Sequence, residues 1–565
     1  MMYSFRSNYT TVLCTMLFVQ FVCIYLIGLS SASDQYDTRS VLVISLDGYG
    51  HDYLSKYPSS NILKMLHSGS HPGRLSNQYP TKTFPNHFSM ATGLFVESHG
   101  VVGNKFYDID LDETLRNSDN RFFQQNKDVE PIWIVNEKAG GVSACFMWPG
   151  CGFNYQNISE SYYLPYNQQY SLRMLIDTAI TLLDPNPQNT NQDHNHDDEY
   201  VPAYTSGESA VNTTNGTSNV PNAYESLIKK PGETRVPSLL MVYYGALDIV
   251  GHKFSPNSPE IEAAIHQVDA ELGHLMNELE RHQLMDRVDV ILMSDNGMTE
   301  VVPHHVIDLS KIIDASWYSV TGSSPLLHIF PSRGKSMKVY EDLKSASLRF
   351  PFSTIIKEDL PDNLHYKANV RVAPLLLQAD PGYVFADFRR MMAMRESEGI
   401  NVTRPYGHHG YDLAECPEME PIMIAVGPSF KENWRVPPAS NVDLFPLLCS
   451  LLGLPEPPNN GSSQTLELMM TTPPILKKIN RYLITLAAIV MAAVVVGGVA
   501  TALYCWRQPS HRHSRVPTDP QDLISGYTYR AHMNNTPGLA SAIMLSDDEL
   551  SEEEKLLTNT EVWEV

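Results

Sequence analysis

The chain has 565 residues, of which 43% are apolar, so it is long enough to bury a large hydrophobic core. Its formal net charge is −22, which argues against a protein that binds a nucleic-acid scaffold through a basic surface. Small nucleotides stay open as ligands, because a bound cation can reverse the sign of the local field.

The first apolar segment lies at the N-terminus. Residues 11–29 are mostly apolar, Arg6 precedes them, and small residues ending at Ala32 follow. A positive start, an apolar centre and a small-residue end are typical of a secretory signal peptide. We predict a signal peptide over residues 1–32, with an uncleaved anchor as the alternative because the apolar stretch is long.

Five short apolar runs follow, and each is continuous rather than alternating. Continuous runs are typical of strands buried on both faces of a sheet. Between two of them, apolar residues recur every three or four positions over residues 259–282, which predicts a helix. The alternation predicts an α/β domain with a largely parallel central sheet flanked by helices. The runs are VLVISLDG (41–48), GVSACFMWPG (141–150), PSLLMVYYGALD (237–248), VDVILMSDNG (288–297) and PIMIAVGP (421–428).

We predict that this domain covers residues 33–462. Within it, residues 186–222 are polar and low in complexity, which predicts a mobile, glycosylated surface insertion. The histidines and aspartates of the insertion offer loose metal binding as the alternative.

The second apolar segment, residues 483–506, carries no Asp, Glu or Lys and only reaches Arg at residue 507. It is long enough to cross a bilayer, so we predict one transmembrane helix there, with a buried core helix as the alternative. A stalk (463–482) would precede it and a cytoplasmic tail (507–565) would follow. With the signal peptide, this predicts a single-pass type I protein of the cell membrane whose large domain faces outside.

The predicted tail carries the acidic run SDDELSEEEKLL. Within it, Glu552, Leu556 and Leu557 resemble an acidic dileucine signal that a sorting adaptor would bind. A disordered charged tail is the alternative.

Four cysteines and five glycosylation sequons lie in the part predicted to be exported. An even number of cysteines there predicts two disulfides, and we favour Cys145–Cys151 and Cys416–Cys449 because these pairs are local in sequence. The two other ways of pairing four cysteines stay open. The sequons are at Asn157, Asn212, Asn215, Asn401 and Asn460.

Carboxylates stand at the ends of three of the predicted strands. Asp47, Asp248 and Asp295 each follow an apolar run, and sites in open α/β sheets form beyond the carboxyl ends of strands. A single such carboxylate is often a satisfied turn residue. Three together would repel one another unless a divalent cation neutralised them.

Histidines extend this candidate metal site. His252 follows Asp248 by four residues, which places both on one face if the segment is helical. His408 and His409 lie in a glycine-flanked turn, although such a pair is often simply exposed. Mixed Asp and His ligands suit zinc.

Thr83 is a candidate nucleophile. Pro85 suits the first turn of a helix and the residues after it keep helical spacing, so Thr83 would lie at a helix N-terminus, where backbone N–H groups favour anions. A plain threonine cap is the alternative.

Four motifs in this order resemble the ectonucleotide pyrophosphatase/phosphodiesterases, which are relatives of alkaline phosphatase. The likeness covers about residues 41–462, and the chain is similar to the small members that have one catalytic domain and a C-terminal membrane span. The motifs are TKTFPNHFSMATGLFVESHGVVGNKFYD (81–108), LDIVGHKFSP (247–256), SDNGM (294–298) and HHGYD (408–412).

The resemblance implies two zinc sites. Asp248, His252 and His409 would hold one zinc ion, whereas Asp47, Thr83 and Asp295 would belong to the other. Thr83 would be the nucleophile that attacks phosphorus and forms a covalent threonyl intermediate.

The resemblance also implies a substrate pocket. Asn104 would donate to a phosphoryl oxygen as charge builds on it. Phe84 and Tyr166 match the aromatic residues that enclose a nucleobase, and Trp148 would line the same pocket.

This sequence departs from the family at several positions. The remaining ligand of the second zinc in the family is a histidine, and Asn296 stands in its place, so that zinc site is expected to be weakened, filled by another ion or supported by a neighbour. Leu247 and Leu413 also replace family residues beside two motifs. Cys151 replaces a serine, which would constrain the pocket through a disulfide.

The leading hypothesis is a zinc-dependent ecto-phosphodiesterase/pyrophosphatase that cleaves extracellular nucleotides to nucleoside 5′-monophosphates. One alternative is a choline-phosphodiester or lysophospholipid hydrolase, because an aromatic pair also suits a quaternary ammonium group. Another is a catalytically weakened binding ectodomain in which Asn296 disables the second zinc.

Overall fold

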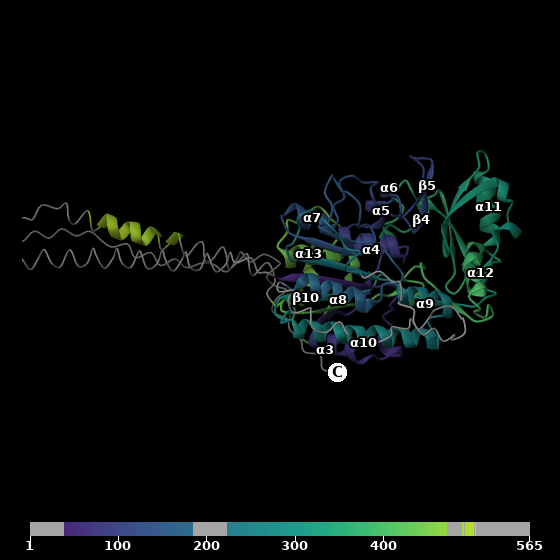
Figure 1. Ribbon diagram of the computed structural model, residues 1–565. Coiled ribbons are helices and arrows are strands. Elements are labelled where there is room, and N and C mark those ends of the chain that lie inside the picture. The colour runs from purple at the N-terminus through teal and green to yellow at the C-terminus, as the bar shows by residue number, and fades with distance from the viewer. Residues whose placement is uncertain (1–38, 185–222, 472–488, 491, 502, 504–565) are drawn as a thin grey trace, which may run out of the picture. The chain divides into compact units, whose positions relative to one another are not determined.

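The computed structural model describes residues 39–184, 223–471, 489–490, 492–501 and 503 (Figure 1). Contacts divide the chain into two compact units, residues 1–493 and 494–565, and the fold below belongs to the first. Among the described residues, no helix is both long and apolar enough to cross a bilayer. The predicted span over 483–506 is only partly described and stays a prediction, and the signal peptide, the insertion and the tail with Glu552, Leu556 and Leu557 lie outside the described residues.

A nine-stranded sheet forms the centre of the described domain, and all five predicted strands belong to it. Their side chains are buried along their whole length, as continuous apolar runs require. Across the sheet the strands are β20 (Trp434–Val436), β2 (Ser70–Pro72), β19 (Met423–Val426), β10 (Val288–Met293), β1 (Ser40–Leu46), β9 (Leu239–Tyr244), β6 (Ser143–Phe146), β7 (Tyr162–Leu164) and β8 (Ile228–Lys229).

The sheet is mixed, so the prediction of a largely parallel sheet holds for its centre only. The run β10–β1–β9–β6–β7 is parallel throughout, and β2 and β20 are also parallel. In contrast, β19 is antiparallel to both β10 and β2, and β7 is antiparallel to β8. An apolar run carries no information on direction. The chain enters β19 from the edge where β10 ends, since Met423 pairs with Met293, and it therefore runs back.

Helices cover both faces of the sheet (Figure 1). One layer holds α3 (Ser60–Ser68), α8 (Leu172–Leu183), α9 (Ala246–Phe254) and α10 (Pro259–Arg281), in which α10 contacts the other three. The other holds α4 (Thr83–Thr92), α7 (Ile132–Lys138) and α13 (Leu444–Leu452), which contact one another. The predicted helix 259–282 is confirmed as α10, where the Ser258 hydroxyl accepts from the Ile261 N–H at 3.2 Å and Pro259 occupies the first turn.

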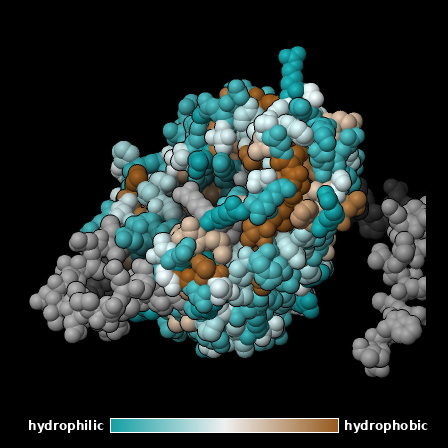
Figure 2. Space-filling view, turned by 90° about the vertical axis from the view of Figure 1, so that its right-hand side faces the viewer, coloured by the Kyte–Doolittle hydropathy of each residue, from teal (hydrophilic) through white to brown (hydrophobic). Residues whose placement is uncertain are grey.

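A smaller lobe lies beside the main sheet, and the sequence did not predict it. Four antiparallel strands form it in the order β13 (Tyr318–Ser323), β14 (Leu326–Pro331), β16 (Leu375–Ala379) and β15 (Phe352–Ile356). Helix α11 (Ser336–Ala346) packs on them, and together they bury a separate apolar cluster. The face of the molecule on this side is largely hydrophilic and carries an elongated hydrophobic strip (Figure 2).

Short elements complete the described domain. The two-stranded pairs are β4 (Lys105–Asp108) with β5 (Glu113–Arg116), β11 (Thr299–Val301) with β18 (Tyr406–His408), β12 (Val306–Ile307) with β17 (Val384–Phe385), and β21 (Ala439–Ser440) with β3 (Leu75–Ser76). The remaining α-helices are α2 (Tyr53–Lys56), α5 (Val96–His99), α6 (Asn120–Phe123), α12 (Arg389–Ser397) and α14 (Ser463–Leu466).

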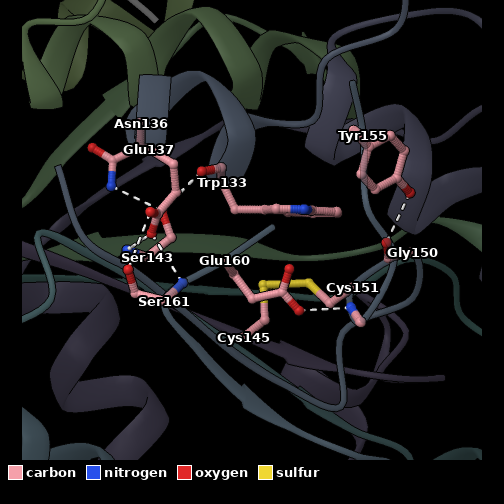
Figure 3. The surroundings of a disulfide bond; sticks show 11 residues. Trp133, Asn136, Glu137, Ser143, Cys145, Gly150, Cys151, Tyr155, Glu160 and Ser161 are labelled. Carbon is pink, nitrogen blue, oxygen red and sulfur yellow. Dashed lines mark hydrogen bonds between the residues drawn. A yellow bond between two sulfur atoms is a disulfide. The ribbon is translucent and has the colours of Figure 1, made fainter. Parts of the chain in front are cut away.

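One of the two predicted disulfides is present. Cys145 in β6 is bonded to Cys151 beyond the end of that strand (Figure 3). The prediction of Cys416–Cys449 is wrong, because both are free, buried thiols. Cys416 packs with Tyr411 in a small cluster, whereas Cys449 lies in α13 within the main core. Proximity in sequence therefore did not predict proximity in space.

The predicted sequons that the structure describes lie at the surface. Asn157, Asn401 and Asn460 are exposed, whereas Asn212 and Asn215 lie outside the described residues. Their glycosylation stays a prediction.

A buried histidine makes stability depend on pH. His99 is fully buried, and its Nδ1 accepts from the Val101 N–H at 3.1 Å, so its Nε2–H donates to the Ser89 hydroxyl at 2.9 Å. Burial lowers the pKa of His99 to about 3. The folded state thus keeps the neutral imidazole, while the unfolded chain takes up a proton near the ordinary pKa of about 6.5.

We expect His99 to weaken folding as the pH falls from about 6.5, because the unfolded state binds the extra proton. At pH 5 this amounts to about 2 kcal/mol. Urea unfolding of the purified protein at pH 7 and pH 5 measures the loss, which should be smaller in His99→Gln. The exposed His67→Gln is the control and should keep the full loss; an undiminished loss in His99→Gln would contradict the assignment.

Candidate active site

The three predicted strand-end carboxylates meet at one edge of the sheet. Strands β10, β1 and β9 are adjacent and parallel, so Asp295, Asp47 and Asp248 follow their carboxyl ends on the same side. Asp47 and Asp295 are at most 1% exposed. Burial, followed by the charge of its neighbours, raises the pKa of Asp47, and burial raises the pKa of Asp295 to about 7. The site therefore concentrates negative charge in a dry place and requires a proton or a cation.

Asp248, His252 and His409 form a group with the geometry of metal ligands. One ligand atom from each lies within 4.8 Å of the others. The Asp248 Oδ1 atom is 3.2 Å from His252 Nε2 and 3.3 Å from His409 Nε2. Burial lowers the pKa of His409 to about 4. Burial acts in the same direction on His252, but the facing Asp248 carboxylate outweighs it and raises the His252 pKa.

The Nδ1 atom of each histidine is hydrogen-bonded to a backbone carbonyl oxygen. His252 Nδ1 lies 2.8 Å from the Gly407 carbonyl oxygen, and His409 Nδ1 lies 2.9 Å from that of Thr81. A carbonyl can only accept, so Nδ1 carries a proton, and Nε2, which faces Asp248, is the nitrogen that a metal ion would bind in the neutral ring. Backbone hydrogen bonds of this kind are typical of histidines that bind metals. These residues fit a zinc ion.

Close packing of two glycines brings these ligands together. His252 lies on α9, whereas His409 directly follows β18. A side chain at Gly407 would approach the Gly251 carbonyl oxygen to 2.6 Å, so β18 can lie this close to α9 only because Gly407 lacks a Cβ. Strand β18 also pairs with β11, which begins just beyond Asn296. This pairing connects the segment that carries His409 to the segment that carries Asp295 and Asn296.

A buried guanidinium fastens the same two elements. Arg395 of α12 donates to the Lys253 carbonyl oxygen of α9 at 2.9 Å and to the Arg404 and Pro405 carbonyl oxygens before β18 at 3.0 and 3.2 Å. It is fully buried and stacks over the Tyr406 ring at 5.3 Å. Arg395 thereby holds α9 at a fixed position relative to β18, the strand that His409 follows.

Thr83 begins α4, as the sequence predicted for a helix N-terminus, and is 7% exposed. One turn later, His87 Nδ1 donates to the Thr83 carbonyl oxygen at 2.8 Å and lies 3.6 Å from Asp295 Oδ2. Its Nε2 accepts from the Ser45 hydroxyl at 2.9 Å. His87 therefore ties the start of α4 to the ends of β1 and β10.

The predicted substrate residues differ in their exposure. Asn104 Oδ1 accepts from the Phe84 N–H at 3.1 Å, which fixes the amide next to Thr83. Phe84 is partly buried against Phe122 and Phe123, while Tyr166 is 52% exposed and packs on Tyr243. Trp148 is only 2% exposed, with its ring 5.0 Å from that of His87, so it lies behind the site rather than at its surface.

Comparisons with known proteins agree with this architecture. A family model described as type I phosphodiesterase / nucleotide pyrophosphatase matches residues 41–412. Human ectonucleotide pyrophosphatase/phosphodiesterase family member 5 is 31% identical over 453 residues, which cover 79% of this chain and 81% of the relative.

The chain belongs to the ectonucleotide pyrophosphatase/phosphodiesterase family. Human bis(5′-adenosyl)-triphosphatase is another relative, 29% identical over 438 residues that cover 77% of this chain and 83% of that protein. A structure of murine member 5, an inactive threonine-to-alanine variant in complex with AMP, superimposes with a TM-score of 0.62 at 30% identity. It covers 77% of this chain and 100% of that one. Membership makes the chain an enzyme of the nucleotide pyrophosphatase/phosphodiesterase class.

Besides Arg395, several residues that support the site of this family member were missed from the sequence. His87 follows Thr83 by one helical turn, a spacing that could have identified it. Tyr243, whose hydroxyl donates to Asp47 Oδ2 at 2.5 Å, comes from the neighbouring strand and gave no local signal. Lys82 donates to the Ser324 carbonyl oxygen at 2.5 Å, and burial lowers its pKa to about 8.

Asn86 holds the segment that presents Thr83. Its Oδ1 accepts from the Gln78 N–H at 2.7 Å, and its Nδ2 lies 3.1 Å from the Gln78 and Pro80 carbonyl oxygens and 3.0 Å from that of Lys82. Asn86 is fully buried, so no water can replace these bonds.

We expect Asn86→Ala to lower the free energy of unfolding by about 2–3 kcal/mol, because it leaves buried backbone groups without partners. Thermal and urea unfolding measure the change. Asn126→Ala is the matched control, because its side chain is exposed, and it should shift stability by less than about 0.5 kcal/mol. Equal effects of the two substitutions would disprove this role of Asn86.

Proposed function

We propose that this enzyme hydrolyses phosphodiester or pyrophosphate bonds of nucleotides and releases nucleoside 5′-monophosphates, with Thr83 as the nucleophile. The single observation that carries the proposal is the position of Thr83 at the start of α4, tied through His87 to Asp295. The AMP complex of an inactive threonine-to-alanine variant of murine member 5 supports the substrate class and the need for a threonine.

Zinc at Asp248, His252 and His409 would supply positive charge to the phosphoryl group when bound. The Asp248 Oδ1 atom faces the Nε2 atoms of both histidines at 3.2 and 3.3 Å, which agrees with a ligand role. The second group of residues lacks the family's histidine and offers oxygen atoms only, so it does not fit zinc.

The chain's own residues would carry the remaining steps. The Thr83 hydroxyl attacks phosphorus and displaces the leaving group, giving a threonyl phosphoester that water then cleaves. The Asn104 Oδ1 atom is engaged by the Phe84 N–H, so its NH₂ group is the part that donates to a phosphoryl oxygen. Phe84 and Tyr166 offer aromatic surface to a base.

The proposed location is the outer face of the cell membrane. The signal peptide, the apolar segment 483–506 and the five sequons favour it. The Cys145–Cys151 disulfide agrees with an oxidising compartment.

We expect Thr83→Ala to lower hydrolysis of a p-nitrophenyl nucleoside 5′-monophosphate ester by at least about 10³-fold, since no other group forms the intermediate. Thr83→Ser should retain measurable activity because it keeps the hydroxyl. Turnover that survives both Thr83→Ala and chelator treatment would disprove the mechanism. A p-nitrophenyl phosphocholine ester run in parallel separates this function from a choline-phosphodiesterase, and no turnover of either ester would favour a weakened binding ectodomain.

We expect Arg395→Met to weaken zinc retention by about 10–100-fold, because α9 and β18 would no longer be held together. Competition with a chromogenic chelator, read as zinc released per chain, measures it without a substrate. Arg389→Met on the same helix is the control, since Arg389 is exposed and pairs with Asp308 instead. Zinc retention equal to the parent in Arg395→Met would rule out the positioning role.

A further inference from the structure

The second cation position of this chain is surrounded by oxygen donors. The residues that the resemblance assigns to it are Asp47, Thr83 and Asp295, which carry carboxylate and hydroxyl oxygens, and Asn296, which carries an amide where relatives supply an imidazole. Asp47 and Asp295 are adjacent in space, since the Gly48 N–H donates to Asp295 Oδ1 at 3.4 Å. The Tyr243 hydroxyl donates to the Asp47 Oδ2 atom, whereas Asp47 Oδ1 is buried without a hydrogen-bond partner among the described residues. Asp47 Oδ1 is therefore a carboxylate oxygen that can still bind a cation.

The Asn296 amide has a fixed orientation. Its Nδ2 donates to Asp295 Oδ2 at 2.6 Å, and the side chain is fully buried. An ionised Asp295 can accept this bond only from the nitrogen, so with a cation bound the amide cannot turn over without placing two acceptors in contact. The Asn296 Oδ1 atom has no hydrogen-bond partner within the described part of the chain. An uncommitted buried carbonyl oxygen is a good ligand for a cation.

Among the residues that the structure describes, no imidazole takes the place of the missing histidine. His87 is the histidine in contact with Asp295, and its two ring nitrogens are used by the Thr83 carbonyl oxygen and the Ser45 hydroxyl. Its ring is also wedged between those of Trp148 and Tyr243, at 5.0 and 5.1 Å. Turning this ring toward a cation would break both hydrogen bonds and the packing.

Carboxylate, hydroxyl and amide oxygens are ligands for hard cations such as Mg²⁺ and Mn²⁺, whereas imidazole favours zinc. We propose that the position formed by Asp47, Thr83, Asp295 and Asn296 takes a hard divalent cation of the Mg²⁺ and Mn²⁺ class, so that the centre holds two different metals. The inference rests on the proposed function, which supplies zinc at Asp248, His252 and His409. The two carboxylates match the charge of a divalent cation, and water completes its coordination.

Metal counting tests the proposal without any substrate. The full-length protein is stripped with a chelator and reloaded with Mn²⁺ in excess and zinc buffered at increasing concentration. Mass spectrometry gives each metal per chain, and electron paramagnetic resonance detects bound Mn²⁺. We expect the parent to bind one zinc and one manganese, with zinc displacing manganese only at high concentration.

Asn296→His is the decisive variant. It restores a nitrogen ligand, so it should bind two zinc ions and shift the zinc-to-manganese selectivity of this position by at least tenfold. Asn296→Asp keeps the donors all oxygen and should retain manganese. His252→Ala should lose zinc but keep manganese, which assigns each metal to its position. Circular dichroism checks that each variant is folded.

Two zinc ions in the parent at the lowest zinc concentration that fills the Asp248 position, with manganese in excess, would overturn the inference. So would the same zinc-to-manganese selectivity in the parent and Asn296→His. Parallel assays with the nucleotide ester separate this failure from that of the proposed function. Hydrolysis by a two-zinc parent would refute the inference alone. Failure to hydrolyse with any metal combination would refute the proposed function, whatever the metal counts.

Discussion

The site depends on carboxylates that the sheet forces together in a dry place. Strands β10, β1 and β9 run in parallel and end at one edge, and Asp295, Asp47 and Asp248 follow them. Like charges that cannot reach water raise one another's pKa or recruit a cation. The surrounding residues offset this negative charge. The Nε2 atoms of His252 and His409 face Asp248, Tyr243 donates to Asp47, and Asn296 donates to Asp295.

The central sheet and the strand-end residues could be predicted because their signals are local. A continuous apolar run predicts a buried strand wherever it occurs, and Pro85 with helical spacing predicts that Thr83 opens a helix. Directions and partners are not local. The run 421–428 does not indicate that β19 is antiparallel to β10. The residues near Cys416 likewise do not indicate that Cys449 packs in a different cluster.

The supporting residues show the same limit. Arg395 is one of many arginines in the sequence, and its role follows only from three carbonyl oxygens on two other segments. Trp148 was predicted from its motif to line a pocket, and the structure adds that its buried ring packs edge-to-face against His87. Family resemblance located the motifs, and the structure adds the residues that hold the motif side chains in place.

The contact between α9 and β18 also sets an order in time. Asp248 and His252 are made near the middle of the chain, whereas His409 is made only after the whole small lobe has been translated. A growing chain therefore carries an incomplete set of ligands until β18 has emerged and paired. Assembly of the Asp248, His252 and His409 group is therefore a late event in biosynthesis, which completes only when most of the described domain has been synthesised.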